Sequence, residues 1–208
     1  HSGAEGLSHV LSQAEILVTL LPLTPETDGL LNAARLALLP KGASIINPGR
    51  GPLIMDEALL EALDAGHVSR AVLDVFREEP LPPGHSFWAH PKVFVTPHIA
   101  GYTLEGKLRG TQFVYNALCK YLQVAPTIDF HTLMPAEVPL FQEVHNPLKD
   151  HERHQLLNKI PVMYDIKADD KRLRSVANAN GDIEGKDFDN LRKNYPLRRE
   201  WQSYVFKI

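Results

Sequence analysis

Three potentially catalytic residues, Arg50, Glu79 and His98, each follow an apolar segment in the first hundred residues. A histidine exchanges protons near neutral pH. A neighbouring carboxylate would orient its ring and favour the imidazolium, and an arginine presents a planar fork to a substrate carboxylate. Glycines on both sides of Arg50 would let the backbone approach a ligand closely. The set suits hydride transfer at a carbon that bears a hydroxyl, although each residue alone also fits a surface ion pair or a loop cap.

Strand-like and helix-like segments alternate around these residues. Apolar runs predict buried strands at residues 16–20, 43–46, 68–75 and 93–95. Asn32 is suited to cap a helix that runs to Leu39, and Asp56 to cap a helix that Gly66 closes. Apolar strands that alternate with helices predict an α/β fold with a parallel sheet. Ligands bind at the carboxyl ends of such strands, which is where the three chemistry-bearing residues lie.

The pattern changes in the second half of the chain. A long helix is predicted over residues 103–123, and from Ala125 onward the sequence is richer in charge, Asn and His. This region is typical of an α+β domain. It predicts helices near residues 147–157, 169–176 and 187–193, strands at 161–164 and 203–208, and a surface loop at 178–185.

Composition limits the class of protein. The 208 residues are 44% hydrophobic and 23% charged, which suffices for a real core. The net charge of -3 gives no basic field, so we expect no nucleic-acid or membrane partner. No apolar run is long enough to span a bilayer, and the first residues do not resemble a signal peptide. The single cysteine, Cys119, favours a reducing, cytoplasmic setting.

Four motifs carry a family resemblance: Leu21–Thr27, Ile46–Gly51, Leu73–Phe76 with Glu79-Pro80 after it, and Thr96–Gly101. Their order and separations resemble those of D-isomer-specific 2-hydroxyacid dehydrogenases. The resemblance implies that Arg50 binds the substrate carboxylate, that His98 is the catalytic acid/base and that Glu79 pairs with it.

The resemblance also implies an NAD cofactor. Asp74 would contact the nicotinamide side of NAD, and the residues lining the cofactor would be Leu21, Pro22, Pro48, Gly49 and Gly101. The sequence contains no G-x-G-x-x-G turn to hold the pyrophosphate. We therefore expect the C-terminal half of a Rossmann-type parallel sheet, with weak NAD affinity, in residues 1–124, which include the exit helix.

The likeness to subfamilies changes near Thr96. From there to the end, the segments Ala100–Lys107, Leu191–Tyr195 and Arg198–Trp201 resemble erythronate-4-phosphate dehydrogenases of vitamin B6 biosynthesis. That likeness implies that Tyr102 contacts the substrate and that residues 125–208 form a small dimerisation domain of a homodimer. Before Thr96, residues 74–83 resemble glyoxylate/hydroxypyruvate reductases.

Three functions stay open on the sequence. The first is NAD-dependent oxidation of a 2-hydroxy acid, 4-phosphoerythronate in particular. The second is glyoxylate or hydroxypyruvate reduction, and the third is a non-catalytic interaction module. Outside the motifs, His151 and His154 form either half a metal site or a solvated helix face. The basic residues Arg192, Lys193, Arg198 and Arg199 either grip a phosphate or partner, or form a basic surface.

Overall fold

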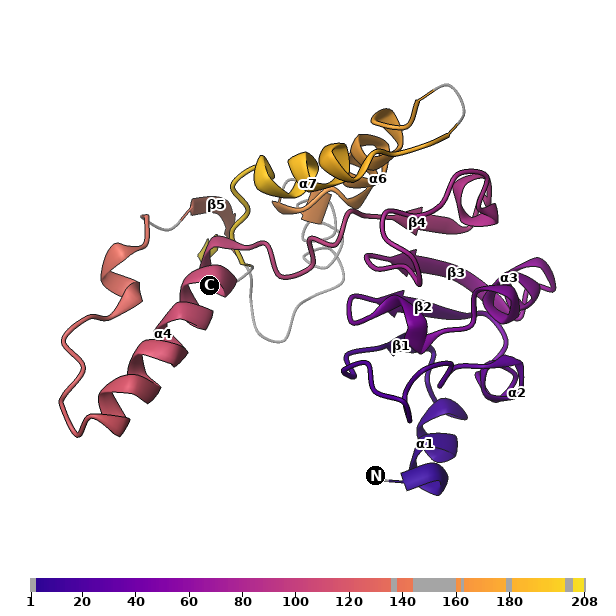
Figure 1. Ribbon diagram of the computed structural model, residues 1–208, viewed down its shortest axis with the longest axis horizontal. Helices are drawn as coiled ribbons and strands as arrows, with labels where there is room; N and C mark the ends of the chain where they lie inside the picture. Colours follow the sequence, from indigo (N-terminus) through magenta and orange to yellow (C-terminus); the bar gives the residue numbers. More distant parts are fainter. Residues whose placement is uncertain are drawn as a thin grey trace. The chain divides into compact units, whose positions relative to one another are not determined.

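The computed structural model describes residues 3–135, 138–143, 160–161, 163–178, 181–200 and 204–207. The chain forms two compact units (Figure 1). Unit 1 contains residues 1–99 and 166–194, and unit 2 contains residues 100–165 and 195–208. The chain therefore leaves unit 1 and later returns to it. Residue 124, the domain boundary expected from the sequence, lies inside unit 2 and is not a point where the chain passes between the units. The division into two functional domains at this residue stays a prediction.

Unit 1 is built on a four-stranded parallel sheet. Its strands are β1 (Ile16–Val18), β2 (Ala43–Asn47), β3 (Val68–Leu73) and β4 (Val93–Val95). They pair in the order β1-β2-β3-β4, and Figure 1 shows them side by side. The predicted α/β fold and its four strands are confirmed. Because the strands are parallel, the segments that follow them emerge at one edge of the sheet.

Helices α1 (Gly3–Leu11), α2 (Ala33–Leu36) and α3 (Asp56–Asp64) precede or separate the strands. Asn32 caps α2 as predicted, since its side-chain oxygen accepts a hydrogen bond from the Arg35 N–H at 3.0 Å. The prediction that Asp56 caps α3 was wrong. Met55 is the N-cap, and Asp56 is the first helical residue, where its carboxylate lies 3.3 Å from His85 Nε2.

The core of unit 1 combines residues from both halves of the chain. Its fully buried side chains from α2, α3 and the strands include Leu36, Ile45, Leu59, Leu63, Val68 and Val95. Helices α6 (Ile166–Ser175) and α7 (Gly185–Lys193) add Leu173 and Phe188 to the same cluster. Both helices were predicted from the sequence, but they pack with the sheet rather than with the remainder of the C-terminal region.

Helix α6 covers the outer edge of β4. The Val95 N–H donates to the Asp170 carboxylate at 2.8 Å, and Arg174 Nη2 donates to the Val93 carbonyl at 3.3 Å. Arg174 Nη1 also donates to the Trp88 carbonyl, and Asp170 and Arg174 form an ion pair at 2.8 Å. Backbone groups that an unpaired edge strand would expose are thus bonded to side chains.

The opposite edge strand, β1, is exposed. Ile16 is 64% exposed, Val18 46% and Leu20 73%. The prediction of a buried strand at residues 16–20 was therefore wrong about burial, although the strand exists. An apolar sequence shows that a strand could be buried, but whether it is buried depends on the elements that pack against it in the tertiary fold.

Unit 2 begins with the long helix α4 (Leu104–Tyr121), which Thr103 caps through a hydrogen bond from the Gly106 N–H at 3.0 Å. Strands β5 (Val138–Glu143) and β6 (Tyr204–Lys207) form a two-stranded parallel sheet. The predicted closing strand is confirmed. The strand predicted at 161–164 was wrong, because Pro161 and Met163 are helical. The helix predicted near 147–157, with His151 and His154, lies outside the described residues.

Within the described part of the chain, we find no helix long and apolar enough to cross a membrane. The same residues contain no cluster of three or more histidine, cysteine or acidic side chains that could hold a metal ion.

Candidate active site

The turn after β2 is fixed by Asn47, which is 1% exposed. Its side-chain oxygen accepts hydrogen bonds from Thr19 Oγ1 at 2.7 Å and from the Gly49 N–H at 3.2 Å. Its amide nitrogen donates to the Arg50 carbonyl at 3.0 Å. One buried amide therefore joins the segment after β1 to the turn that carries Arg50.

Asp74, after the next strand of the sheet, joins two loops in the same way as Asn47. It follows β3 and is 5% exposed. Its Oδ1 accepts hydrogen bonds from Thr96 Oγ1 at 2.5 Å and from the Ile99 N–H at 2.8 Å, and its carbonyl accepts from the His98 N–H at 2.8 Å. Asp74 thereby holds the turn that follows β4.

His98 lies in that turn with a positive φ of 55°. Few residues other than glycine adopt this left-handed region, and it costs about 1 kcal/mol for a side chain with a Cβ. The hydrogen bonds that the His98 and Ile99 N–H groups donate to Asp74 hold the conformation. Strained residues that their surroundings hold in place gather at functional sites, so the backbone supports the choice of His98 as a candidate.

Glu79 and His98 are brought together as predicted. Glu79 Oε2 lies 2.8 Å from His98 Nδ1, and Oε1 accepts a hydrogen bond from the Phe76 N–H at 3.2 Å. The carboxylate is thus fixed by one oxygen and orients the imidazole with the other. Both side chains are about 30% exposed, at 27% for Glu79 and 30% for His98. A histidine that donates from Nδ1 presents Nε2 for proton transfer.

Arg50 lies at the same edge of the sheet and is exposed. Its Nη1 donates to the Gly49 carbonyl at 2.6 Å. Arg50 follows β2 and His98 follows β4, and one strand separates these two strands. With strands about 4.8 Å apart, the ends of β2 and β4 are about 10 Å apart. A long arginine side chain can reach across part of that distance toward a small acid.

The two glycines beside Arg50 allow backbone to approach backbone. A Cβ on Gly51 would lie 1.8 Å from the Phe76 carbonyl carbon, and a Cβ on Gly49 would lie 2.7 Å from the Thr19 carbonyl oxygen. These glycines press the turn after β2 against the segments after β1 and β3, so the loops that carry Arg50 and Glu79 are in direct contact. Their predicted approach to a ligand stays a prediction.

The segment after β1 offers an apolar surface. Leu21 is 47% exposed, Leu23 is 44% exposed, and Pro22 between them is also exposed. Thr27 Oγ1 donates to the Pro22 carbonyl at 2.7 Å and closes this loop. Such a surface at the carboxyl end of a parallel sheet fits a flat, largely apolar ring. The residues present therefore fit the nicotinamide side of a dinucleotide.

Gly101 and Tyr102 belong to unit 2, whereas the other predicted site residues belong to unit 1. A Cβ added to Gly101 would meet no atom within 4 Å. The Tyr102 ring lies against Lys107, whose Nζ is 4.1 Å from the ring centroid. Each unit thus carries its own part of the predicted residue set.

The sequence did not single out Thr19 and Asn47 as positioning residues. Their hydrogen bond joins residues 28 positions apart in the chain. A polar residue at the end of an otherwise apolar strand is the signal that could have found each of them, because a buried polar side chain needs a partner. Asp74 was predicted as a cofactor contact, and its hydrogen bonds to Thr96 and Ile99 give it a structural task as well.

A second pair of titratable side chains lies at the start of α3. Burial raises the pKa of Asp56 above its ordinary value, and the nearby positive charges of His85 and Arg77 partly oppose the rise. His85 Nδ1 accepts a hydrogen bond from the Phe87 N–H at 3.2 Å, so the ring presents Nε2 to Asp56. This pair lies on α3 and the loop before β4, apart from the strand-end residues.

Two family models match the chain. Residues 2–100 match the D-isomer specific 2-hydroxyacid dehydrogenase, NAD binding domain, and residues 138–208 match a domain of unknown function, DUF3410. The curated erythronate-4-phosphate dehydrogenase of Psychrobacter cryohalolentis is 40% identical over 223 residues, covering 97% of this chain and 54% of that protein. That of Proteus mirabilis is 41% identical, covering 95% and 51%. The chain spans about half the length of these relatives.

Solved structures agree on the fold. A D-isomer specific 2-hydroxyacid dehydrogenase from Xanthobacter autotrophicus, in complex with NADPH and MES, is 44% identical with a TM-score of 0.52, covering 62% of this chain and 54% of that one. An NADPH-dependent glyoxylate/hydroxypyruvate reductase from Sinorhizobium meliloti, in complex with NADP and sulfate, is 36% identical with a TM-score of 0.52, covering 61% and 41%. The parallel sheet, its strand-end residues and the match over residues 2–100 assign this region to the NAD-binding domain family of the D-isomer-specific 2-hydroxyacid dehydrogenases.

Proposed function

We propose that this chain carries the catalytic residues of an NAD-dependent dehydrogenase that oxidises the 2-hydroxy acid 4-phosphoerythronate, as a step toward pyridoxal phosphate. The contact between Glu79 Oε2 and His98 Nδ1 at 2.8 Å carries the proposal. It supplies an oriented acid/base at the carboxyl end of a sheet of the matching family. Identity to erythronate-4-phosphate dehydrogenases over nearly the whole chain supports the substrate.

Each residue of the set has one task in this reaction. His98 Nε2 takes the proton of the substrate hydroxyl, and the Glu79 carboxylate stabilises the imidazolium that results. Arg50 binds the substrate carboxylate through its planar fork. When bound, the nicotinamide ring supplies the hydride acceptor. In the reverse direction His98 returns the proton to the carbonyl oxygen.

The cofactor contacts in this chain lie on the nicotinamide side. Leu21, Pro22, Pro48 and Gly49 follow β1 and β2, and Asp74 follows β3. Gly101 and the substrate contact Tyr102 complete the proposed set from unit 2. Because the sequence has no glycine-rich phosphate turn, these contacts alone favour weak binding of the dinucleotide.

The proposal includes a homodimer formed through residues 125–208. Size-exclusion chromatography with light scattering on the purified chain tests it directly. A mass of twice the monomer is expected. A monomer at all concentrations would contradict the proposal of a dimer without affecting the proposed chemistry.

Two measurements test the catalytic proposal. NADH fluorescence is titrated with the purified chain, and NADH formation is then followed with NAD and 4-phosphoerythronate. We expect weak but saturable NADH binding and slow turnover, with turnover reduced at least about 100-fold further in His98→Asn while NADH binding is retained. Arg50→Lys keeps the charge but loses the fork, and should raise KM for the acid.

The alternatives predict different results. The chain would be a glyoxylate or hydroxypyruvate reductase if it reduced either of these acids faster than the 2-oxo acid formed from 4-phosphoerythronate. Absence of saturable NADH binding, or equal turnover of wild type and His98→Asn, would contradict the catalytic proposal and favour a non-catalytic interaction module.

A further inference from the structure

Helix α4 turns its polar face, rather than its apolar face, toward its own unit. Gln112 donates a hydrogen bond to the Ile128 carbonyl at 3.0 Å and accepts one from the Phe130 N–H at 2.8 Å. The Tyr115 hydroxyl accepts from the Thr127 N–H at 2.9 Å. An amphipathic helix ordinarily packs its apolar face against its domain and leaves its polar face in water. The chain that follows α4 covers the polar face instead.

The opposite face of α4 carries a row of residues that we name the seam: Gly110, Val114, Ala117 and Tyr121. Their spacing of four, three and four keeps them on one side of the helix, about half a turn around the axis from Gln112. All four are exposed, with Val114 at 71% and Tyr121 at 83%. A row of apolar side chains in this position indicates contact with another molecule.

The order of sizes along the seam makes it complementary to itself. Small residues, Gly110 and Ala117, alternate with large ones, Val114 and Tyr121. In an antiparallel pair with its twofold axis beside the middle of the seam, Val114 faces the partner's Ala117 and Tyr121 faces the partner's Gly110. A Cβ added to Gly110 would meet no atom within 4 Å, so space for the ring is open. Large residues then meet small ones at every step, and the two helices can pack closely.

Charge favours the same antiparallel arrangement. Lys107 is exposed in the first turn of α4, where the helix dipole is positive. Antiparallel pairing sets it beside the carboxyl end of the partner's α4, whose last carbonyls carry partial negative charge. Parallel pairing would instead set Lys107 beside the partner's Lys107, Tyr121 against the partner's Tyr121, and Gly110 against the partner's Gly110. The seam therefore fits a second copy in one direction only.

The exposed area is sufficient for a weak dimer. Phe113 and Leu118 flank the seam and are 67% and 52% exposed. Together with Val114 and Tyr121 they expose on the order of 500 Å² per copy, given the usual areas of such side chains. An antiparallel pair would bury about 1,000 Å² in total, which is the lower end of the range for specific interfaces. We therefore expect association that depends on concentration.

We propose that the seam of α4 is a docking surface for a second copy of this chain, joined antiparallel around a twofold axis. Such an interface is isologous, so it closes as a dimer and leaves no open end. It lies outside residues 125–208 and is therefore distinct from the proposed dimerisation domain. It lies within unit 2 and does not depend on the proposed chemistry.

Cysteine cross-linking tests the register. Val114→Cys and Ala117→Cys are made separately in a Cys119→Ala background, one of them with a tag that changes its mass, and are mixed before oxidation. The proposed register places residues 114 and 117 of the two copies within reach of a disulfide. The mixture should therefore give the tagged–untagged dimer at least about tenfold faster than either variant alone gives a dimer. Asn116→Cys, mixed with Val114→Cys, is the matched control and should not cross-link, because Asn116 accepts a hydrogen bond from Gln112 on the covered face.

Light scattering over a range of concentrations tests the contribution of the seam to affinity. Ala117→Glu places an unpaired charge between the two helices, whereas Asn116→Glu adds the same charge on the covered face. Ala117 is exposed and glutamate is a good helix former, so Ala117→Glu should fold as the wild type does. We expect Ala117→Glu to raise the dissociation constant of the dimer at least about tenfold and Asn116→Glu to leave it within about twofold.

The mixed disulfide decides between the outcomes. Its rapid formation supports the seam, even where a second contact in residues 125–208 also holds the dimer. Faster cross-linking of like variants than of the mixture overturns the antiparallel pair. A dimer that persists in Ala117→Glu without a mixed disulfide places the contact elsewhere and overturns the seam. A wild type that stays monomeric at all concentrations overturns both proposed dimer contacts, while NADH binding and turnover still test the catalytic proposal separately.

Discussion

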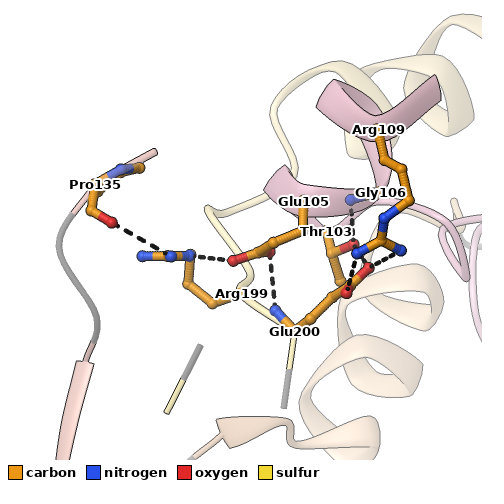
Figure 2. A network of polar contacts seen from close by, with 7 residues as sticks. All are labelled: Thr103, Glu105, Gly106, Arg109, Pro135, Arg199 and Glu200. Atoms are coloured by element: carbon orange, nitrogen blue, oxygen red, sulfur yellow. Dashed lines mark hydrogen bonds and ion pairs between the residues drawn. The ribbon is translucent and has the colours of Figure 1, made fainter. Parts of the chain in front are cut away.

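The strand-end loops of unit 1 and the clasp of unit 2 (Thr103, Glu105, Arg109, Arg199 and Glu200; Figure 2) hold their segments by different means. In the loops, backbone lies directly against backbone at Gly51 and Phe76, and the buried side chains of Asn47 and Asp74 add directed hydrogen bonds. The clasp instead relies on the buried Glu105–Arg199 ion pair. A loop held by close backbone contact has no room for an added atom. A buried ion pair is destabilised most when one of its two charges is removed.

The largest effect is expected where backbone meets backbone. Gly51→Ala would place a Cβ 1.8 Å from the Phe76 carbonyl carbon, so one of the two loops must move. We expect a loss of about 4 kcal/mol or more in the free energy of unfolding of unit 1. Chemical unfolding, with hydrogen exchange of β2 and β3, measures it. Gly110→Ala, on the open surface of α4, is the control and should cost nothing. Unchanged exchange in Gly51→Ala would contradict the contact.

The clasp should respond to loss of a charge. Glu105→Gln keeps the shape but leaves the Arg199 guanidinium buried without its counter-charge. We expect a loss of about 3 kcal/mol, seen as faster hydrogen exchange along α4 with β2 and β3 unaffected. The double variant Glu105→Gln/Arg199→Met should recover part of the loss. Equal exchange of α4 in wild type and Glu105→Gln would show that the ion pair does not hold the segment.

A smaller effect is expected when a loop loses hydrogen bonds but no space. Asn47→Ala removes three hydrogen bonds and leaves the Thr19 hydroxyl and the Gly49 N–H without this partner. We expect a loss of about 2 kcal/mol and a larger drop in turnover than in NADH affinity, because the turn carries Arg50. Asn116→Ala, exposed on α4, is the control. If Asn47→Ala lowers stability but leaves KM for the acid unchanged, Asn47 does not position Arg50.

The smallest effect concerns pH and lies outside both regions. The pKa of Asp56 is raised by burial above its ordinary value of 3.8, so the folded state binds this proton more tightly than the unfolded state. Its contribution to stability is complete below pH 3.8 and is lost as pH rises through the raised pKa. Asp56→Asn cannot ionise, so its stability relative to wild type should increase over that window. Urea unfolding at a series of pH values measures the difference.

Asp64→Asn is the control for that series, because Asp64 ends the same helix, also contacts a histidine and is 76% exposed. The Asp64→Asn series gives the baseline against which the Asp56→Asn difference is compared. A flat difference for Asp56→Asn would mean that burial does not raise the pKa of this carboxyl. Neither variant should alter the exchange of the strand-end loops or of α4.

Local signals in the sequence predicted most of the elements. The four strands and the Asn32 cap were predicted because apolar runs and capping residues act over a few neighbours. The exposure of β1 and the helical state of Pro161 and Met163 were missed, since tertiary neighbours determine both. One relative aligns across the point near Thr96 where the likeness changes, over 97% of the chain.

The candidate site was predicted in part. The Glu79–His98 contact was anticipated through the family resemblance, because strand order alone places both residues at one edge of the sheet without showing that they touch. The contact of Gly51 with Phe76 could not, because spacing does not report whether a glycine approaches a ligand or another backbone segment. Nor could the clasp, whose partners are 94 residues apart in the case of Glu105 and Arg199.

The covering of β4 by α6 has a consequence for how the protein folds. Val95 and Asp170 are 75 residues apart, and all of that intervening chain must be made before their bond can form. Contacts of such separation close large loops and slow the folding of a domain. During synthesis, β4 therefore emerges from the ribosome well before α6, with its outer edge open. We expect a nascent chain that ends near residue 124 to pair with other strands and to bind chaperones, and one extended beyond Asn194 to be released from them.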